Sequence, residues 1–186
     1  LAKLHDPYPL LRGIGERGIG LGALLRLNSL GGKTGSGRDA RCFIEEGYSV
    51  RACDASANMA ALATAHAGVP VQHPDFDAFL RSQPAGSADG VWACASLLHL
   101  PSLEALGTTL RLIGETLRPG GAAYVSFKIG EGGAVRLSEG RRFLDMSEPD
   151  LRAMVRACGT LRVERCWTSA DRLADDRPPW LSAIIT

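Results

Sequence analysis

Short apolar runs alternate along the chain with longer segments in which apolar residues recur every three or four positions. The short runs, bounded by glycine, proline or polar residues, predict strands. They cover residues 23–30, 48–53, 69–72, 90–95, 122–127, 161–167 and 180–185. The segments with helical spacing predict helices over residues 38–46, 57–67, 103–117 and 148–158, with one or two helical turns at 76–81. Strands that alternate with helices in this way indicate an α/β fold with a mainly parallel sheet.

The residues at the predicted helix ends agree with this pattern. Ser56, Ser102 and Ser147 each precede a helix, where a hydroxyl can accept a free backbone N–H. The last two strands have no helix between them, which indicates an antiparallel pair. We therefore predict a Rossmann-like, doubly wound sheet of about seven strands, mainly parallel, with an antiparallel C-terminal edge strand.

Two stretches lack a clear periodicity. Residues 128–146 are polar and rich in glycine, and their length predicts a functional loop. Within that loop, Arg141, Arg142 and Phe143 would either contact an acidic or aromatic substrate or form a solvated face. Prolines and glycines interrupt residues 1–22, which would be an arm or lid over a pocket, or a loose terminus.

Composition narrows the class of protein. The 186 residues fit one domain, 1–186, and 45% hydrophobic and 22% charged residues are typical of a globular chain. A net charge of +1 predicts no nucleic-acid partner, and the apolar runs are too short to span a membrane. No signal peptide is visible. The five cysteines form no C-x-x-C pair, so we predict free thiols, no metal site and a cytoplasmic protein. The protein is expected to be a monomer or a homodimer.

A glycine turn stands between the first predicted strand and the first helix. Gly35-Ser36-Gly37 is followed, after the second strand, by Asp54. Glycines there would let a ligand approach the main chain, and the carboxylate would accept hydrogen bonds from a ribose. A phosphate-binding loop is excluded because Leu27 stands where that motif needs a glycine. The turn also satisfies the dinucleotide pattern, so a nicotinamide-dependent oxidoreductase stays an alternative.

Several further motifs follow in unbroken order over residues 35–158. They are Gly35-Ser36-Gly37-Arg38-Asp39, then Gly47-Tyr48-Ser49-Val50 leading to Asp54-Ala55-Ser56, Ala88-Asp89-Gly90-Val91-Trp92-Ala93-Cys94-Ala95-Ser96-Leu97-Leu98-His99-Leu100-Pro101, Leu117-Arg118-Pro119-Gly120-Gly121 and Ser126-Phe127-Lys128. This series resembles the class I S-adenosylmethionine-dependent methyltransferases, in particular small single-domain bacterial ones. The resemblance implies methyl transfer from S-adenosylmethionine to a small-molecule nucleophile.

The resemblance also implies a set of cofactor-binding residues. Gly35 and Gly37 would lie against the methionine part, and Asp54 would accept hydrogen bonds from both ribose hydroxyls. Ala55, Asp75 and Phe76 would contact the adenine. Cys94 and Ala95 would line the methionine tail through backbone groups.

The chain departs from the family pattern just before the glycine turn, and one histidine is a candidate catalytic residue. Family members carry an acidic residue and a further glycine where this chain has Gly31 and Lys33. Losing that acid would weaken binding of the cofactor's ammonium by about 1.5–3 kcal/mol, so a non-catalytic relative with a degenerate loop is a second alternative. His99 follows the fourth predicted strand, where it would act as a general base or only pack locally.

Overall fold

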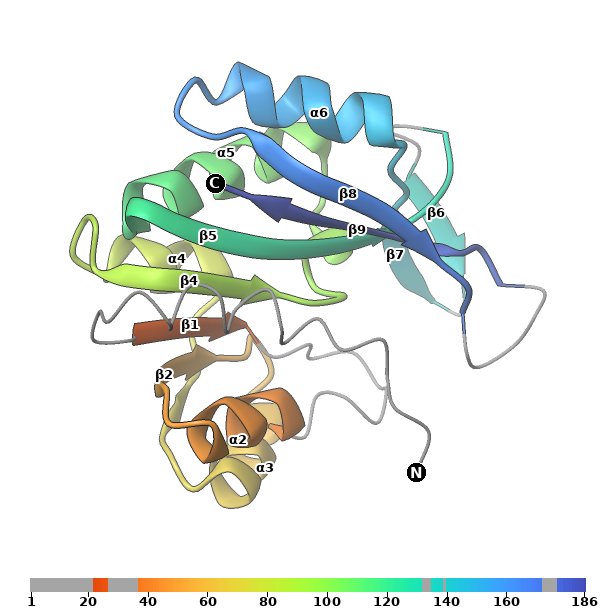
Figure 1. The fold of residues 1–186 in the computed structure, drawn as a ribbon. Coiled ribbons are helices and arrows are strands. Elements are labelled where there is room, and N and C mark those ends of the chain that lie inside the picture. The colour runs from red at the N-terminus through yellow and green to blue at the C-terminus, as the bar shows by residue number, and fades with distance from the viewer. Residues whose placement is uncertain (1–21, 27–36, 132–134, 139, 172–176) are drawn as a thin grey trace.

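The computed structural model describes residues 22–26, 37–131, 135–138, 140–171 and 177–186. Within them, a seven-stranded sheet has the order β3-β2-β1-β4-β5-β9-β8 (Figure 1). Its strands are β1 (Gly22–Arg26), β2 (Ser49–Cys53), β3 (Val71–Gln72), β4 (Ala88–Ala93), β5 (Leu117–Lys128), β8 (Val163–Ser169) and β9 (Trp180–Ile185). The predicted α/β fold is confirmed, and its sheet is mixed. Gly35 and residues 31–34, where the sequence differs from the family pattern, lie outside the described residues.

The parallel part of the sheet places its strand ends at one edge. β1 pairs in parallel with β2 on one side and with β4 on the other. β3 and β5 extend the sheet outward from β2 and β4, again in parallel. The chain therefore winds from β1 to β3 in one direction and then returns to β4. In open α/β sheets, ligands bind beyond the carboxyl ends of the strands at such a reversal.

The antiparallel pair at the end of the chain is confirmed, but the position predicted for its last strand is wrong. β9 pairs antiparallel with both β5 and β8, so β9 lies inside the sheet and β8 forms the edge. Burial explains the order. Five of the six residues of β9 are buried, whereas none of the β8 residues is, so the more apolar strand takes the interior position.

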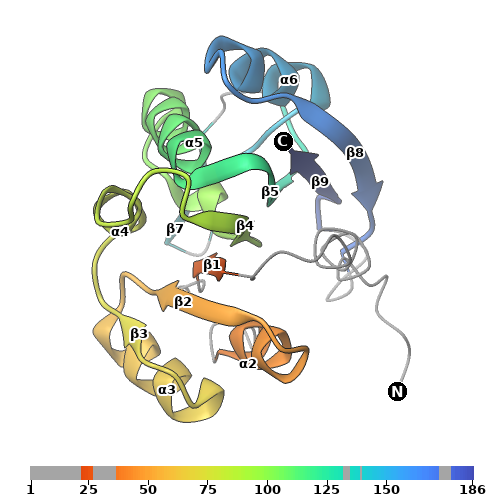
Figure 2. The same cartoon turned by 60° about the vertical axis from the view of Figure 1, so that its left-hand side comes forward.

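Five helices of the described part cover the two faces of the sheet (Figure 2). They are α2 (Arg38–Glu45), α3 (Ala57–Ala67), α4 (Phe76–Arg81), α5 (Leu103–Thr116) and α6 (Glu148–Ala157). α4, α5 and α6 pack on one face, and α2 and α3 pack on the other. Successive side chains of β4 point to opposite faces of the sheet. Val91 and Ala93 lie in the core beneath α4, α5 and α6, and Trp92 lies in the core beneath α2 and α3.

The predicted helix caps are confirmed. The hydroxyls of Ser56, Ser102 and Ser147 accept the backbone N–H groups of residues 59, 105 and 150, at 3.4, 3.2 and 3.3 Å. These bonds satisfy N–H groups that have no partner inside the helix. None of the helices in the described ranges is both long enough and apolar enough to cross a lipid bilayer.

The prediction of a long loop over residues 128–146 is wrong in part. The structure contains a hairpin there, β6 (Val135–Ser138) and β7 (Arg141–Leu144), which pair antiparallel apart from the main sheet. Each strand has four residues, and the side chain of Leu137 is 74% exposed. The hairpin therefore lacks the contrast between a buried and a polar face by which short strands are recognised in a sequence.

Candidate active site

The candidate site lies at the carboxyl edge of the parallel strands. Arg26 at the end of β1 pairs with Cys53 in β2, and Leu25 pairs with Trp92 in β4. Asp54 and Cys94, which follow β2 and β4, therefore lie on either side of the end of β1. The sequence predicted both as cofactor contacts, and the fold brings them to the same edge.

Asp54 is completely buried at the end of β2. Its Oδ1 atom accepts the N–H of Ser56 at 2.8 Å, and its own N–H donates to the carbonyl of Gln72 at 3.0 Å. These two bonds fix both the main chain and the carboxylate just before α3 begins. A carboxylate held in this way can accept the hydroxyls of a ligand without further ordering.

Three predicted adenine contacts have different surroundings. Ala55 is exposed, and its carbonyl oxygen lies 3.0 Å from Nε2 of His73. Asp75 is also exposed, and its Oδ1 accepts the N–H of Ala78 at 2.8 Å, capping α4. Phe76 is only 2% exposed and packs in the core beneath α4. Its role in packing is clear, and its contact with adenine stays a prediction, as do those of Ala55 and Asp75.

Gly37 begins α2 with a left-handed backbone, φ +81°. A Cβ atom at this position would lie 2.8 Å from the carbonyl oxygen of Ala63 in α3. Packing of α2 against α3 therefore requires glycine here, independently of any ligand. Its predicted contact with the cofactor stays a prediction, and that of Gly35 lies outside the described residues.

The segment after β4 has an unusual backbone. Ala95 has φ +47° and is the only non-glycine residue of the described ranges with a positive φ. Its N–H donates to Oγ of Ser126 in β5 at 2.8 Å, which holds the segment in place. Such a conformation costs on the order of 1–3 kcal/mol and is found mostly at functional sites. The next residue, Ser96, is 1% exposed, and its hydroxyl finds no hydrogen-bond partner within the described part of the chain.

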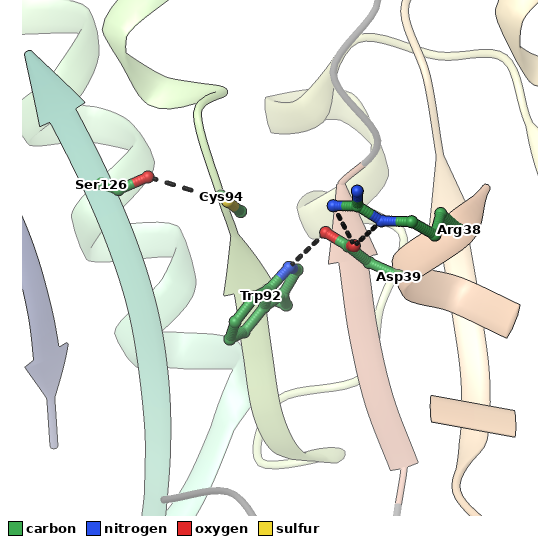
Figure 3. Close-up of polar contacts among 5 residues, drawn as sticks. All are labelled: Arg38, Asp39, Trp92, Cys94 and Ser126. Atoms are coloured by element: carbon green, nitrogen blue, oxygen red, sulfur yellow. Dashed lines mark hydrogen bonds and ion pairs between the residues drawn. The ribbon is translucent and has the colours of Figure 1, made fainter. Parts of the chain in front are cut away.

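The Cys94 thiol resists ionisation because its pKa is raised. The Ser126 hydroxyl lies 3.9 Å from its sulfur (Figure 3). Burial, and then the charge of the Asp39 carboxylate, raise the pKa of the Cys94 thiol to about 12. The thiol is therefore neutral at physiological pH and does not act as a nucleophile.

A buried carboxylate that the sequence did not predict lies beside this segment. Oδ2 of Asp39 accepts the indole N–H of Trp92 at 3.0 Å, and Oδ1 accepts the Arg38 guanidinium at 3.2 Å (Figure 3). Asp39 thus joins the start of α2 to β4 across β1. The signal in the sequence was an acidic residue on the face of a short helix that otherwise buries Ala40 and Phe43.

His99 ends a short 3-10 helix, η1 (Leu97–His99), just beyond Ser96. Its Nδ1 atom lies 2.8 Å from the carbonyl oxygen of Arg142 in β7, and its ring lies 5.1 Å from that of Phe143. The hairpin and η1 therefore meet at the same edge as Asp54 and Cys94. Of the loop residues named from the sequence, Phe143 and the main chain of Arg142 contact His99.

Comparisons with known proteins agree on one class. Residues 33–121 match the model of a family described as "Methyltransferase domain". A search of curated protein sequences finds no match. Solved structures share the fold at low sequence identity. A SAM-dependent methyltransferase from Methanosarcina mazei superposes with a TM-score of 0.72 at 16% identity, over 97% of both chains.

A second solved structure contains a reaction product of the cofactor. It is the 1,6-didemethyltoxoflavin-N1-methyltransferase of Burkholderia thailandensis with bound 1,6-didemethyltoxoflavin and S-adenosylhomocysteine. It superposes with a TM-score of 0.68 at 20% identity, over 100% of this chain and 92% of that one. A methyltransferase from Clostridium acetobutylicum gives 0.69 at 12% identity, over 95% and 88%.

The fold and the matched segment define the class of protein: an enzyme that transfers methyl groups from S-adenosylmethionine. The resemblance in the sequence is thereby confirmed: residues 33–121 match a methyltransferase domain, and the fold is shared with solved SAM-dependent methyltransferases.

The described residues fit this cofactor. S-adenosylmethionine presents a ribose diol and two cationic groups, the sulfonium and the ammonium. The carboxylates of Asp54 and Asp39 are buried at the edge where such a ligand would lie. The buried Ser96 hydroxyl, which has no partner within the described ranges, is available to a polar ligand atom.

Proposed function

We propose that the chain methylates a small molecule at an oxygen or nitrogen atom, with Asp54 holding the cofactor's ribose and His99 acting as general base. Ala55 and Asp75 would contact the adenine, and the backbone of Cys94 and Ala95, with the glycines Gly35 and Gly37, would line the methionine tail. The single observation that supports this arrangement most is the buried carboxylate of Asp54 beside the reversal between β1 and β4.

The chemistry explains the small number of catalytic groups. S-adenosylmethionine, when bound, supplies an electrophilic methyl carbon whose bond to sulfur breaks with the electron pair leaving on the sulfur. The protein's task is then to align the acceptor and to exclude water. His99 would take the proton that an O–H or N–H acceptor loses when its lone pair forms the new bond to carbon.

The partners follow from composition and from one relative. The toxoflavin methyltransferase carries a bound small molecule, which supports a small-molecule acceptor here. The net charge of +1 supports a function without nucleic acid. We further propose one domain, monomeric or homodimeric, in the cytoplasm, where its five free thiols suit a reducing environment.

Calorimetry with S-adenosylhomocysteine tests the proposal without knowledge of the acceptor. We expect saturable binding to the full chain, and no change of NADH or NADPH fluorescence on mixing. No heat of binding at millimolar S-adenosylhomocysteine would contradict the proposed enzyme and favour a relative that has lost its cofactor. Binding of the nicotinamide cofactor instead would favour the oxidoreductase.

A further inference from the structure

The side chain of His99 contacts the hairpin β6–β7 through a hydrogen bond and a ring contact. We propose that hairpin β6–β7 fixes His99 in the tautomer that carries its proton on Nδ1, which leaves Nε2 as the basic nitrogen. Arg142 and Phe143 would then be positioning residues. The catalytic meaning of this arrangement rests on the proposed function, whereas the tautomer itself does not.

The first contact is the hydrogen bond between His99 and the main chain of β7. Nδ1 lies 2.8 Å from the carbonyl oxygen of Arg142, and a carbonyl oxygen only accepts hydrogen bonds. Nδ1 must therefore be the donor. In a neutral imidazole the other nitrogen then carries the lone pair, so this bond selects the tautomer. Because the acceptor is main chain, the selection does not depend on the Arg142 side chain.

The second contact fixes the plane of the ring. The Phe143 ring lies 5.1 Å from the His99 ring at an interplanar angle of 59°. On the same face of the hairpin, the Arg136 guanidinium lies 4.7 Å from the centre of the Phe143 ring. Arg136 is in turn bound through two nitrogens to the Asp145 carboxylate, at 2.7 and 3.1 Å. A chain of contacts thus runs from Asp145 through Arg136 and Phe143 to the imidazole.

The base of the hairpin is tied to the main sheet. The N–H of Met146 donates to the carbonyl of Lys128, the last residue of β5, at 2.9 Å. Ile129 and Met146 form an isolated parallel bridge. A Cβ atom on Gly130 would lie 2.7 Å from Cβ of Asp145, so the two segments pack as closely as glycine allows. The hairpin therefore presents Arg142 and Phe143 to His99 from a fixed position at the carboxyl edge of β5.

This arrangement indicates the kind of acceptor. A neutral imidazole with a lone pair on Nε2 is of use when the nucleophilic atom still bears a proton at neutral pH. An alcohol, a phenol or an N–H group of a heterocycle has such a proton, whereas a tertiary amine has none. We therefore expect an O–H or N–H acceptor, whose proton passes to Nε2 of His99.

Long-range proton–nitrogen NMR on the full chain, with 15N-labelled histidine at mildly alkaline pH, tests the tautomer directly. His99 is assigned by its loss in His99→Gln. We expect His99 to carry its proton on Nδ1. His73 is an internal control, because its Nε2 lies 3.0 Å from the carbonyl of Ala55 and should carry the proton. A His99 signal with the proton on Nε2 would overturn the proposal.

Two variants on opposite faces of the hairpin test the positioning role. Phe143→Leu should shift His99 towards a mixture of tautomers, and Leu137→Ser, at a side chain that is 74% exposed, should leave the signal unchanged. Equal effects of the two variants would contradict a role for Phe143. Calorimetry separates this result from the function: the Nδ1 tautomer without S-adenosylhomocysteine binding would support the hairpin's role and contradict the proposed function.

Discussion

At the scale of single residues, the two halves of the candidate site depend on different groups. The Asp54 carboxylate offers charge to a ligand, and its position is fixed by the N–H of Ser56. The segment from Cys94 to Ser96 offers mainly backbone, in the conformation imposed by Ala95. A side-chain substitution should therefore affect ligand binding much more at Asp54 than at Cys94.

We predict that Asp54→Asn weakens the binding of S-adenosylhomocysteine by about 1.5–3 kcal/mol, or roughly 10- to 150-fold, because charge-assisted hydrogen bonds are lost. The amide oxygen can still accept the N–H of Ser56, so the fold should persist. Glu45→Gln is the matched control, since that carboxylate is exposed and pairs with Arg41 one turn away. Calorimetry on both variants measures the difference, and equal affinities would show that the ribose contact is misassigned.

Sequence and structure agree best for residues whose role is local. The serine caps could be predicted because a cap depends only on the four residues that follow it. Asp39 and Trp92 could not, because they are 53 positions apart and only the sheet brings the carboxylate to the indole. Phe76, which the resemblance placed at the adenine, is buried in the core, and its contact with the cofactor stays a prediction.

At the scale of elements, the close approach of α2 and α3 shapes the amino end of the first helix. Gly37 lies where the two helices touch, and its left-handed backbone turns the chain into α2. The same glycine was predicted to lie against the cofactor. A substitution at Gly37 would therefore disturb the packing of α2 on α3 as well as any ligand binding.

We predict that Gly37→Ala lowers the free energy of unfolding by at least about 1 kcal/mol more than Gly47→Ala does, because overpacking adds to the backbone penalty. Gly47 is the control, since it has φ +89° and its added Cβ would meet nothing within 4 Å. Gly47→Ala should cost about 1–2 kcal/mol from the left-handed backbone alone. Denaturant unfolding of both variants tests this, and equal losses would disprove the packing role.

The features that the sequence did not predict, the hairpin β6–β7 and the interior position of β9, have weak or non-local sequence patterns. The hairpin β6–β7 is held by contacts with η1 and the end of β5, and its short strands show little apolar contrast. The place of β9 inside the sheet depends on competition with β8 for burial, which becomes visible only when the two strands are compared. The helices α3 and α5, each of which begins at a serine cap, were predicted nearly to the residue.

At the scale of the whole molecule, one face of the sheet buries ionisable groups that must stay neutral. Burial, and then the neighbouring Cys94, raise the pKa of Tyr124, as burial raises that of the Cys94 thiol. The Tyr124 hydroxyl lies 3.0 Å from the Ser182 hydroxyl, and its ring stacks on Trp92 at 4.1 Å between centroids. Both groups keep their protons in the folded state after the unfolded chain has lost them.

We predict that stability falls as the pH rises above about 9, the ordinary pKa of a thiol, because only the unfolded state then releases its proton. The thiol contributes to this fall up to about pH 12, where it ionises in the folded state as well. Cys94→Ala should reduce the slope, as should Tyr124→Phe at higher pH. Denaturant unfolding across this range measures the slope, and identical slopes in wild type and Cys94→Ala would contradict a thiol that stays neutral in the folded state.

We propose that the cofactor binds over the carboxyl ends of β1 and β4. A crystal structure of the full chain grown with S-adenosylhomocysteine would locate the ligand. We predict density for the ligand at that edge, with the ribose hydroxyls on the Asp54 carboxylate and the methionine tail along Cys94 and Ala95. Density elsewhere, or none at this edge under saturating ligand, would contradict a cofactor site at the ends of β1 and β4.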